Sequence, residues 1–317
     1  MISKEMKTDF SIVFGKNLSP EFQTQLNKIF SGNIIDSDNS RLVFDNDTIT
    51  PVVRNIPRFV PGDNYTASFS FQWTNYTTTQ LDSSQDSDLT LLELQSKTGL
   101  TPDDVKDKLI LDAGVGIGRH TEILASWGAY VVGVDLSEAV ETARDNLKEY
   151  PNAVVLQADI GNLPFKPDQF DHILSMGVLH HTPDTKSFAL GLLPFLKPGG
   201  QISIWVYSTL FSRRGEWVPI VSKLPMTGFN AWSDWIVEIA RDKPNNHWIA
   251  AFMRQFPFAI HHPTKERSAL ALFDGFTPTY HWTHKPEEVA QWFSEAGLKD
   301  IKFSRIPTSV SARKPLN

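Results

Sequence analysis

The stretch LILDAGVGIGRHTEILASWGAYVVGVDLS, from Leu109 to Ser137, decides the fold. A short apolar run over Leu109–Asp112 is followed by glycines spaced G-x-G-x-G and by a helical pattern over Arg119–Trp127. A second apolar run, Tyr130–Asp135, comes next. This order of strand, tight turn, helix and strand predicts a parallel βαβ unit. The spacing differs from G-x-G-x-x-G, the fingerprint of a dinucleotide-binding loop, so it leaves the ligand of the turn open.

The same alternation continues beyond this stretch. Further strands are predicted at 153–159, 170–176 and 201–207, and further helices at 137–150, with Ser137 as N-cap, at 188–196, ending at KPGG, and at 286–296. A closing antiparallel hairpin is predicted over 298–306 and 309–314. We therefore predict an α/β fold with a Rossmann-like, doubly wound sheet of seven strands.

Four regions are expected along the 317 residues. Residues 1–100 read as an N-terminal extension that packs on the core, and their second part, 61–100, resembles neither a clean helix nor a clean strand. Residues 101–207 form the core. Residues 208–285 interrupt the alternation of strands and helices and are rich in Trp and His. We interpret them as a mainly helical lid over the strand ends. Residues 286–317 complete the sheet.

The composition of the chain excludes several kinds of binding partner and of catalytic or metal-binding chemistry. The net charge is −6 and no basic block stands out, so a nucleic-acid partner is not expected. The absence of Cys excludes disulfides, thiolate metal sites and Cys nucleophiles. No secretory signal and no apolar run long enough to span a membrane are recognised, so a cytoplasmic protein without membrane contact is the expectation. Nothing in the sequence indicates the oligomeric state.

The glycines of the turn, Gly114, Gly116 and Gly118, would let a ligand approach the backbone closely. The following helix offers free N–H groups that suit a phosphate or a carboxylate. Asp112, at the end of the first strand, would oppose a phosphate but suit an ammonium group. A ligand that carries both a carboxylate and an ammonium group is an amino acid.

Two more carboxylates follow at the ends of the next strands. Asp135 is placed to accept both hydroxyls of a ribose. Asp159 is placed to accept from an exocyclic amine such as that of adenine, with Leu136 and Ile160 as apolar walls. Amino acid, ribose and adenine together make S-adenosylmethionine.

These residues resemble a known family. The motifs LDAGVGIGRH, VVGVDLS, ADIGNLPF, FDHILSMGVLHHTPD and LKPGGQISIWVY, in this order over residues 109–207, resemble the class I S-adenosylmethionine-dependent methyltransferases. The resemblance implies cofactor contacts with the methionine moiety at Gly114 and Gly116, with the ribose at Asp135, with the adenine at Asp159 and Ile160, and near the sulfonium at Met176.

A wider resemblance is to a subgroup of enzymes with a methyltransferase domain 11-like core. In this subgroup a small zinc-ribbon-like module with paired Cys often comes first, and a Cys-free chain would have lost its metal. The segment YTASFSFQW is similar to one that lies near the cofactor in the subgroup. The resemblance therefore implies cofactor contacts for Tyr65, Phe71 and Trp73.

The residues that would bind the methyl acceptor are indicated less clearly by the sequence than those that would bind the cofactor. His180 and His181 fall beside the expected methyl group, where either would take a proton from a substrate hydroxyl, or would only shape the loop. Residues of the lid are candidates for contact with the acceptor or for ordinary core packing: His261, His262, Asp274, Tyr280, His281 and His284. No metal site is expected, because no H-x-x-x-H or H-E-x-x-H pattern occurs.

Three functions remain open on the sequence. The leading hypothesis is methyl transfer from S-adenosylmethionine to a small-molecule acceptor, at oxygen or nitrogen, by in-line displacement. The alternatives are a methyltransferase that acts on a macromolecule, tRNA or protein, and a non-catalytic scaffold that binds the cofactor.

Overall fold

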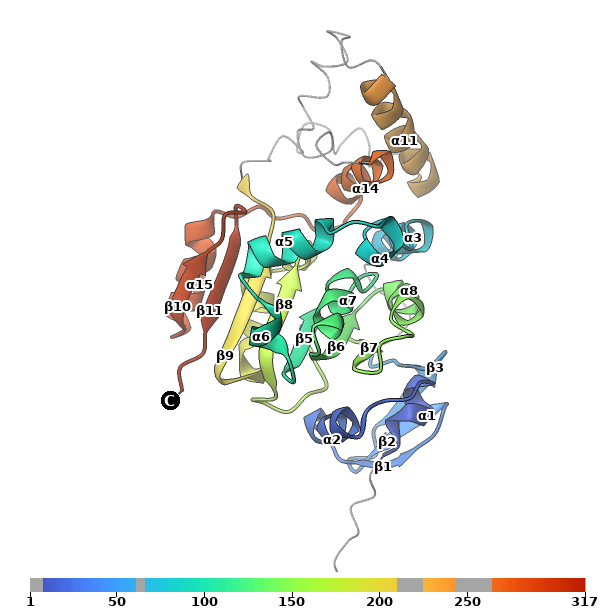
Figure 1. Ribbon diagram of the computed structural model, residues 1–317, viewed down its shortest axis with the longest axis vertical. Helices are drawn as coiled ribbons and strands as arrows, with labels where there is room; N and C mark the ends of the chain where they lie inside the picture. Colours follow the sequence, from blue (N-terminus) through green and yellow to red (C-terminus); the bar gives the residue numbers. More distant parts are fainter. Residues whose placement is uncertain (1–7, 61–65, 210–224, 243–263, 317) are drawn as a thin grey trace, which may run out of the picture.

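The computed structural model describes residues 8–60, 66–209, 225–242 and 264–316. A seven-stranded sheet with the order β10-β11-β9-β8-β5-β6-β7 lies at its centre (Figure 1). Its strands along the chain are β5 (Leu109–Ala113), β6 (Tyr130–Asp135), β7 (Ala153–Gln157), β8 (Phe170–Met176), β9 (Leu196–Trp205), β10 (Lys299–Phe303) and β11 (Ser309–Arg313). Strands β5 to β9 pair in parallel, and the hairpin β10–β11 joins β9 antiparallel, which confirms the predicted sheet and its closing hairpin.

Helices cover both faces of the sheet because alternate residues of its strands point to opposite sides. The flanking helices of the core are α7 (Arg119–Ser126), α8 (Ala139–Asn146), α9 (Thr185–Gly191) and α15 (Pro286–Glu295). In β5, Leu109 and Leu111 belong to the apolar cluster that includes residues of α9 and α15. Ile110, between them, belongs to the cluster that includes residues of α7. Strands buried on both faces explain the continuous apolar runs of the sequence.

Two predicted helices have misplaced ends. Helix α8 begins two residues late, with Glu138 at its N-cap, and ends four residues early, at Asn146. The hydroxyl of Ser137 still accepts from the backbone N–H of Ala139, the first residue of α8, and donates to Asp135. Helix α9 begins and ends early, because Asp184 caps it by accepting from the backbone of Ser187. The KPGG segment therefore lies within β9 and does not terminate a helix.

Residues 8–60 form a small unit of their own, drawn in blue in Figure 1. It contains α1 (Phe10–Phe14), α2 (Pro20–Ile29) and the antiparallel sheet β1 (Ile34–Ser37), β2 (Arg41–Phe44), β3 (Ile49–Val53) and β4 (Ile56–Pro57). Its apolar side chains share one cluster with the core. Arg58 adds a polar link, donating to Gln157 at 2.7 Å and to Glu138 at 3.1 Å.

The described part of residues 61–100 is helical, which corrects the expectation that it forms no clean helix. It contains α3 (Ala67–Asn75), α4 (Asp82–Gln85) and α5 (Leu89–Thr98), and α6 (Pro102–Val105) follows. Helix α3 faces a cavity on one side and contacts α8 on another, so its sequence lacks a single apolar stripe.

The described part of residues 208–285, the segment predicted to form a lid, contains two helices in contact with each other, α11 (Met226–Asp242) and α14 (Lys265–Phe276). Figure 1 shows both at the end of the molecule opposite the small N-terminal sheet, with α14 nearer the core. None of the helices in the described ranges has the length and apolar character that crossing a membrane requires.

Candidate active site

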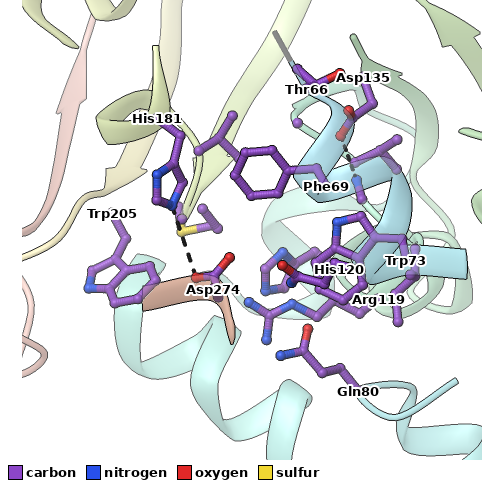
Figure 2. Close-up of a pocket in the computed structure, with 18 of the residues that line it drawn as sticks. Thr66, Phe69, Trp73, Gln80, Arg119, His120, Asp135, His181, Trp205 and Asp274 are labelled. Atoms are coloured by element: carbon purple, nitrogen blue, oxygen red, sulfur yellow. Dashed lines mark hydrogen bonds and ion pairs between the residues drawn. The ribbon is translucent and has the colours of Figure 1, made fainter. Parts of the chain in front are cut away.

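A cavity opens where β5, β6 and β8 end, between α3 and α14 (Figure 2). Many residues predicted for the site line it: Trp73, Gly114, Gly116, Asp135, Leu136, Asp159, Ile160, Met176, His181 and Asp274. The topology brings them together because the carboxyl ends of parallel strands meet at one edge of a sheet.

The glycine turn shapes the floor of this cavity. Gly114 has φ +95°, and a Cβ at this position would lie 2.2 Å from the side chain of Val178. Gly118 has φ +88° and sits at the N-cap of α7, where a Cβ would lie 2.9 Å from Leu147. Gly118 therefore serves packing and is absent from the cavity wall, whereas Gly116 lines it opposite the ring of Trp73.

Asp135 fixes the turn while bordering the cavity. Its Oδ2 accepts from the backbone N–H of Gly116 at 3.0 Å, and its Oδ1 accepts from the backbone and hydroxyl of Ser137 at 2.9 and 2.7 Å. Burial raises the pKa of Asp135 despite these bonds. Asp159 also lines the cavity and accepts from the backbone N–H of Gly161 at 2.8 Å.

Besides Gly118, two residues predicted to touch the cofactor lie away from the cavity wall. Asp112 is 1% exposed, its Oδ2 accepts from the hydroxyl of Thr121 at 2.7 Å, and burial raises its pKa to about 7. This arrangement gives no support to its predicted contact with an ammonium group. Phe71 stacks on Phe273 of α14, with ring centroids 5.6 Å apart, and so joins α3 to the lid.

The two neighbouring histidines have different surroundings. His181 lines the cavity, with Nδ1 at 2.9 Å from the carbonyl oxygen of Tyr280 and Nε2 at 4.0 Å from Oδ2 of Asp274 (Figure 2). His180 is fully buried, and its ring stacks on that of Tyr207 at 3.9 Å. Burial lowers the pKa of His180 well below its usual value, so this ring is neutral. The structure separates the predicted pair into one cavity residue and one packing residue.

The other candidates from the lid are placed around this cluster. Tyr280 contributes its carbonyl oxygen to His181, and the ring of His281 lies 5.6 Å from that of His181. His284 lies 3.1 Å from a carboxylate oxygen of Glu288. None of the three lines the cavity. The predictions for Tyr65, His261 and His262 lie outside the described residues.

The end of the cavity next to α5 is strongly charged. Glu93 of α5 accepts from Arg119 at 2.9 Å and is also bound by Lys97, whose ammonium lies 3.2 Å from a ring centroid of Trp205. Burial by itself would raise the pKa of Glu93, but Arg119 and Lys97 hold it well below its usual value. Arg267 of α14 lines the same cavity.

Comparison with known proteins identifies the family. Residues 111–204 match the model of a methyltransferase domain. A demethylmenaquinone methyltransferase of Clavibacter sepedonicus is 30% identical over 185 residues, which cover 55% of this chain and 75% of that protein. The chain belongs to the class I S-adenosylmethionine-dependent methyltransferases.

Further similarities cover less of each protein. A ubiquinone biosynthesis O-methyltransferase of Coxiella burnetii is 35% identical over 100 residues, 31% of this chain and 43% of that protein. A solved S-adenosylmethionine-dependent methyltransferase from Mesorhizobium loti is 27% identical with a TM-score of 0.32, over 34% of this chain and 50% of that chain. The chain thus spans half or less of the length of these two proteins.

The family membership confirms the predicted enzyme class and its cofactor, S-adenosylmethionine. The cavity fits this group, because the glycine turn at Gly114 and Gly116 and the strand-end carboxylates of Asp135 and Asp159 line it together. The individual contacts assigned to the predicted cofactor residues remain predictions, as does the lost zinc-ribbon module; the described residues hold no group of potential metal ligands.

Several residues that line the cavity of this methyltransferase were not predicted from the sequence. Tyr207 donates its hydroxyl to Asp274, and its place at the end of the strand predicted over 201–207 was a usable signal. Phe69 and Arg119 lie inside the motifs YTASFSFQW and LDAGVGIGRH, whereas Arg267 carried no such signal because its place depends on how α14 packs at the cavity.

Proposed function

We propose that this methyltransferase transfers the methyl group of S-adenosylmethionine to an oxygen or nitrogen of a small-molecule acceptor. The observation that carries the proposal is the cluster of His181, Tyr207 and Asp274 on the cavity wall beside Met176. These three polar side chains come from a 3-10 turn after β8, from the end of β9 and from α14, and they converge on one point.

The cluster is suited to hold an O–H or N–H group and to receive its proton. Asp274 is fixed by the hydroxyl of Tyr207 and keeps part of its carboxylate exposed to the cavity. His181 is assigned the tautomer in which Nδ1–H donates to the carbonyl of Tyr280, which turns Nε2 towards Asp274. An acceptor hydroxyl would bind Asp274, and its proton would pass to the Asp274–His181 pair during transfer.

The rest of the cavity supplies alignment and exclusion of water. Bound S-adenosylmethionine supplies an electrophilic methyl group, and in-line displacement then requires the acceptor atom to be aligned with it. Phe69 of α3 lies with its ring 5.1 Å from that of His181, and Trp205 borders the same space (Figure 2). These aromatic walls favour a flat or apolar acceptor body with one polar group.

Two further observations support a small acceptor. The relatives named above are a demethylmenaquinone methyltransferase and a ubiquinone biosynthesis O-methyltransferase, and both names indicate small-molecule acceptors. The net charge of −6 makes a phosphate-backbone substrate less favourable.

The test is a transfer assay with S-adenosylmethionine labelled on its methyl group. Purified protein is incubated with a panel of small phenols, alcohols and amines, with bulk tRNA and with protein extract. We expect label in a small molecule, and an Asp274→Asn variant that loses about 100-fold or more in rate. Glu266→Gln, an exposed carboxylate on the same helix, is the matched control. Label only in RNA or protein would refute the proposal, as would full activity of Asp274→Asn.

A further inference from the structure

In the cluster of His181, Tyr207 and Asp274, the protons are already donated to other groups. Tyr207 donates its hydroxyl proton to Oδ2 of Asp274. Nδ1 of His181 lies 2.9 Å from the carbonyl oxygen of Tyr280, and because a carbonyl oxygen only accepts, the proton of the neutral ring is assigned to Nδ1 and Nε2 carries a lone pair. The cluster therefore offers hydrogen-bond acceptors to a ligand, and no donor.

Two of these acceptors face each other across a short gap. Nε2 of His181 lies 4.0 Å from Oδ2 of Asp274, which is too far for a direct hydrogen bond. A ligand atom with two donors could bind both of them at once. A hydroxyl group has one proton and would bind only one of the two, whereas a protonated amine has two or three N–H donors and no lone pair. The hydrogen-bonding pattern therefore favours an ammonium ion over a hydroxyl.

The charge of Asp274 favours the same ligand. Its side chain is 22% exposed, and no ion pair within the described ranges joins it to Lys or Arg. Lys97, which lies against the ring of Trp205, is paired with Glu93. Because a largely buried carboxylate without a basic partner is destabilising, Asp274 is suited to bind a cationic ligand.

The aromatic rings around the cluster are steeply inclined to one another. The ring of Tyr207 lies at 80° to that of His181, with centroids 5.5 Å apart, and the ring of Phe69 lies at 56° to it, at 5.1 Å. Figure 2 shows Phe69 and His181 grouped around the carboxylate of Asp274. A flat group stacks between parallel rings, but inclined rings beside a carboxylate form a box that suits a compact cation.

We infer that the methyl acceptor is a primary or secondary amine, which binds as an ammonium ion in the cluster of His181, Tyr207 and Asp274. One N–H proton passes to Nε2 of His181, which frees the lone pair of the nitrogen. This lone pair forms the bond to the methyl carbon, and the C–S bond breaks with its electron pair going to sulfur. The products are an N-methylammonium ion and S-adenosylhomocysteine. The inference rests on the proposed function and narrows its acceptor atom to nitrogen.

The relatives do not decide between oxygen and nitrogen for this chain. Phe69, Tyr207 and Asp274 all lie outside residues 111–204, which match the methyltransferase domain. The acceptor end of the cavity therefore depends on segments that the shared domain does not include. The O-methyltransferase named among the relatives supports a small acceptor without fixing the acceptor atom here.

Pairs of ligands with the same carbon skeleton test the inference without turnover. Benzylamine is compared with benzyl alcohol, and 2-phenylethylamine with 2-phenylethanol, by calorimetry on protein saturated with S-adenosylhomocysteine. We expect the amine of at least one pair to bind about 10-fold or more tightly than its alcohol. Asp274→Asn should abolish this preference, because the amide carries no charge, and should leave the affinity for the alcohol within about 3-fold. Glu266→Gln, on the same helix, should keep the preference.

The atom that receives the methyl group gives a second readout on the wild-type protein, which does not depend on how the variant folds. In the transfer assay we expect label on nitrogen of an amine. Label on oxygen of a small molecule overturns the amine inference alone and leaves the proposed function standing. Alcohols that bind as tightly as their amines, or an absence of binding for every amine, also overturn it. Label only in RNA or protein contradicts the proposed function itself.

Discussion

The part of the cavity proposed to bind the cofactor (the cofactor half) and the part proposed to bind the acceptor (the acceptor half) are built in different ways. The cofactor half uses the glycine turn, Asp135 and Asp159, which lie within about fifty residues at the ends of neighbouring strands. The acceptor half uses Phe69, His181 and Asp274, which come from three elements spread along most of the chain. Local motifs therefore contain the residues proposed for the methyl donor, whereas the site proposed for the acceptor depends on the packing of α14 and α3 on the core.

The largest expected effect concerns the acceptor half. His181→Ala removes the partner of Asp274 for the acceptor proton, and we expect kcat to fall by about 100-fold or more, with a flatter pH–rate profile. Binding of S-adenosylhomocysteine should change by less than a few-fold. Steady-state kinetics with the acceptor found by the transfer assay give both values.

His180 provides the matched comparison. His180→Phe keeps a ring stacked on Tyr207 and removes two buried nitrogens that have no partner in the described structure, so the rate and the melting temperature should be maintained. A large loss of rate with His180→Phe, and none with His181→Ala, would reverse the assignment of the two histidines.

The next effect concerns the glycine turn of the cofactor half. A Cβ on Gly114 would lie 2.2 Å from the side chain of Val178, and the alanine would have to keep the backbone angle φ of +95°. Gly114→Ala should therefore destabilise the fold by about 3 kcal/mol and abolish measurable cofactor binding. Gly99→Ala is the control, because Gly99 also has positive φ, at +71°, but faces open space; it should cost only about 1 kcal/mol. Denaturant titration compares them, and equal losses would show that the clash with Val178 is unimportant.

A smaller effect concerns the pH dependence of the core. Burial raises the pKa of Asp112 to about 7, so this group stabilises the fold most below its ordinary pKa near 4, and the contribution is lost as pH rises through about 7. Asp112→Asn should therefore gain stability relative to wild type between pH 5 and pH 8, on the order of 2 kcal/mol. Melting curves without cofactor test this, and a constant difference between the two proteins at all pH values would contradict it.

The core was predictable from sequence for a physical reason. Strands such as β5 and β6 are short and buried on both faces, so they read as continuous apolar runs, and the turn between them requires glycine. The parallel sheet with its closing hairpin and the cavity residues of the cofactor half follow from this local pattern. The start of α9 was misplaced because a single capping residue, Asp184, sets it, and the ends of α8 differ from the prediction by only two to four residues.

The acceptor half depended on information that no local pattern contains. His180 and His181 follow the same strand, and only their packing decides that one ring stacks on Tyr207 while the other reaches the cavity. Arg267 was overlooked because a single arginine on an amphipathic helix has the pattern of a surface residue. Its burial arises from contact between α14 and the segment around Thr79.

The smallest expected effect distinguishes two carboxylates within the cofactor half. Asp135 accepts three hydrogen bonds that hold the glycine turn, so Asp135→Asn removes a charge that both a ribose and the turn require. We expect cofactor affinity to fall by about 1–2 kcal/mol, roughly 10-fold. Asp159 already accepts from Gly161, and an amide oxygen can still accept from an adenine amine, so Asp159→Asn should change affinity by less than about 3-fold. Calorimetry with S-adenosylhomocysteine ranks the two variants. If Asp159→Asn proves the more damaging, charge at the adenine end contributes more than charge at the ribose, and the assignment of the two strand-end carboxylates must be exchanged.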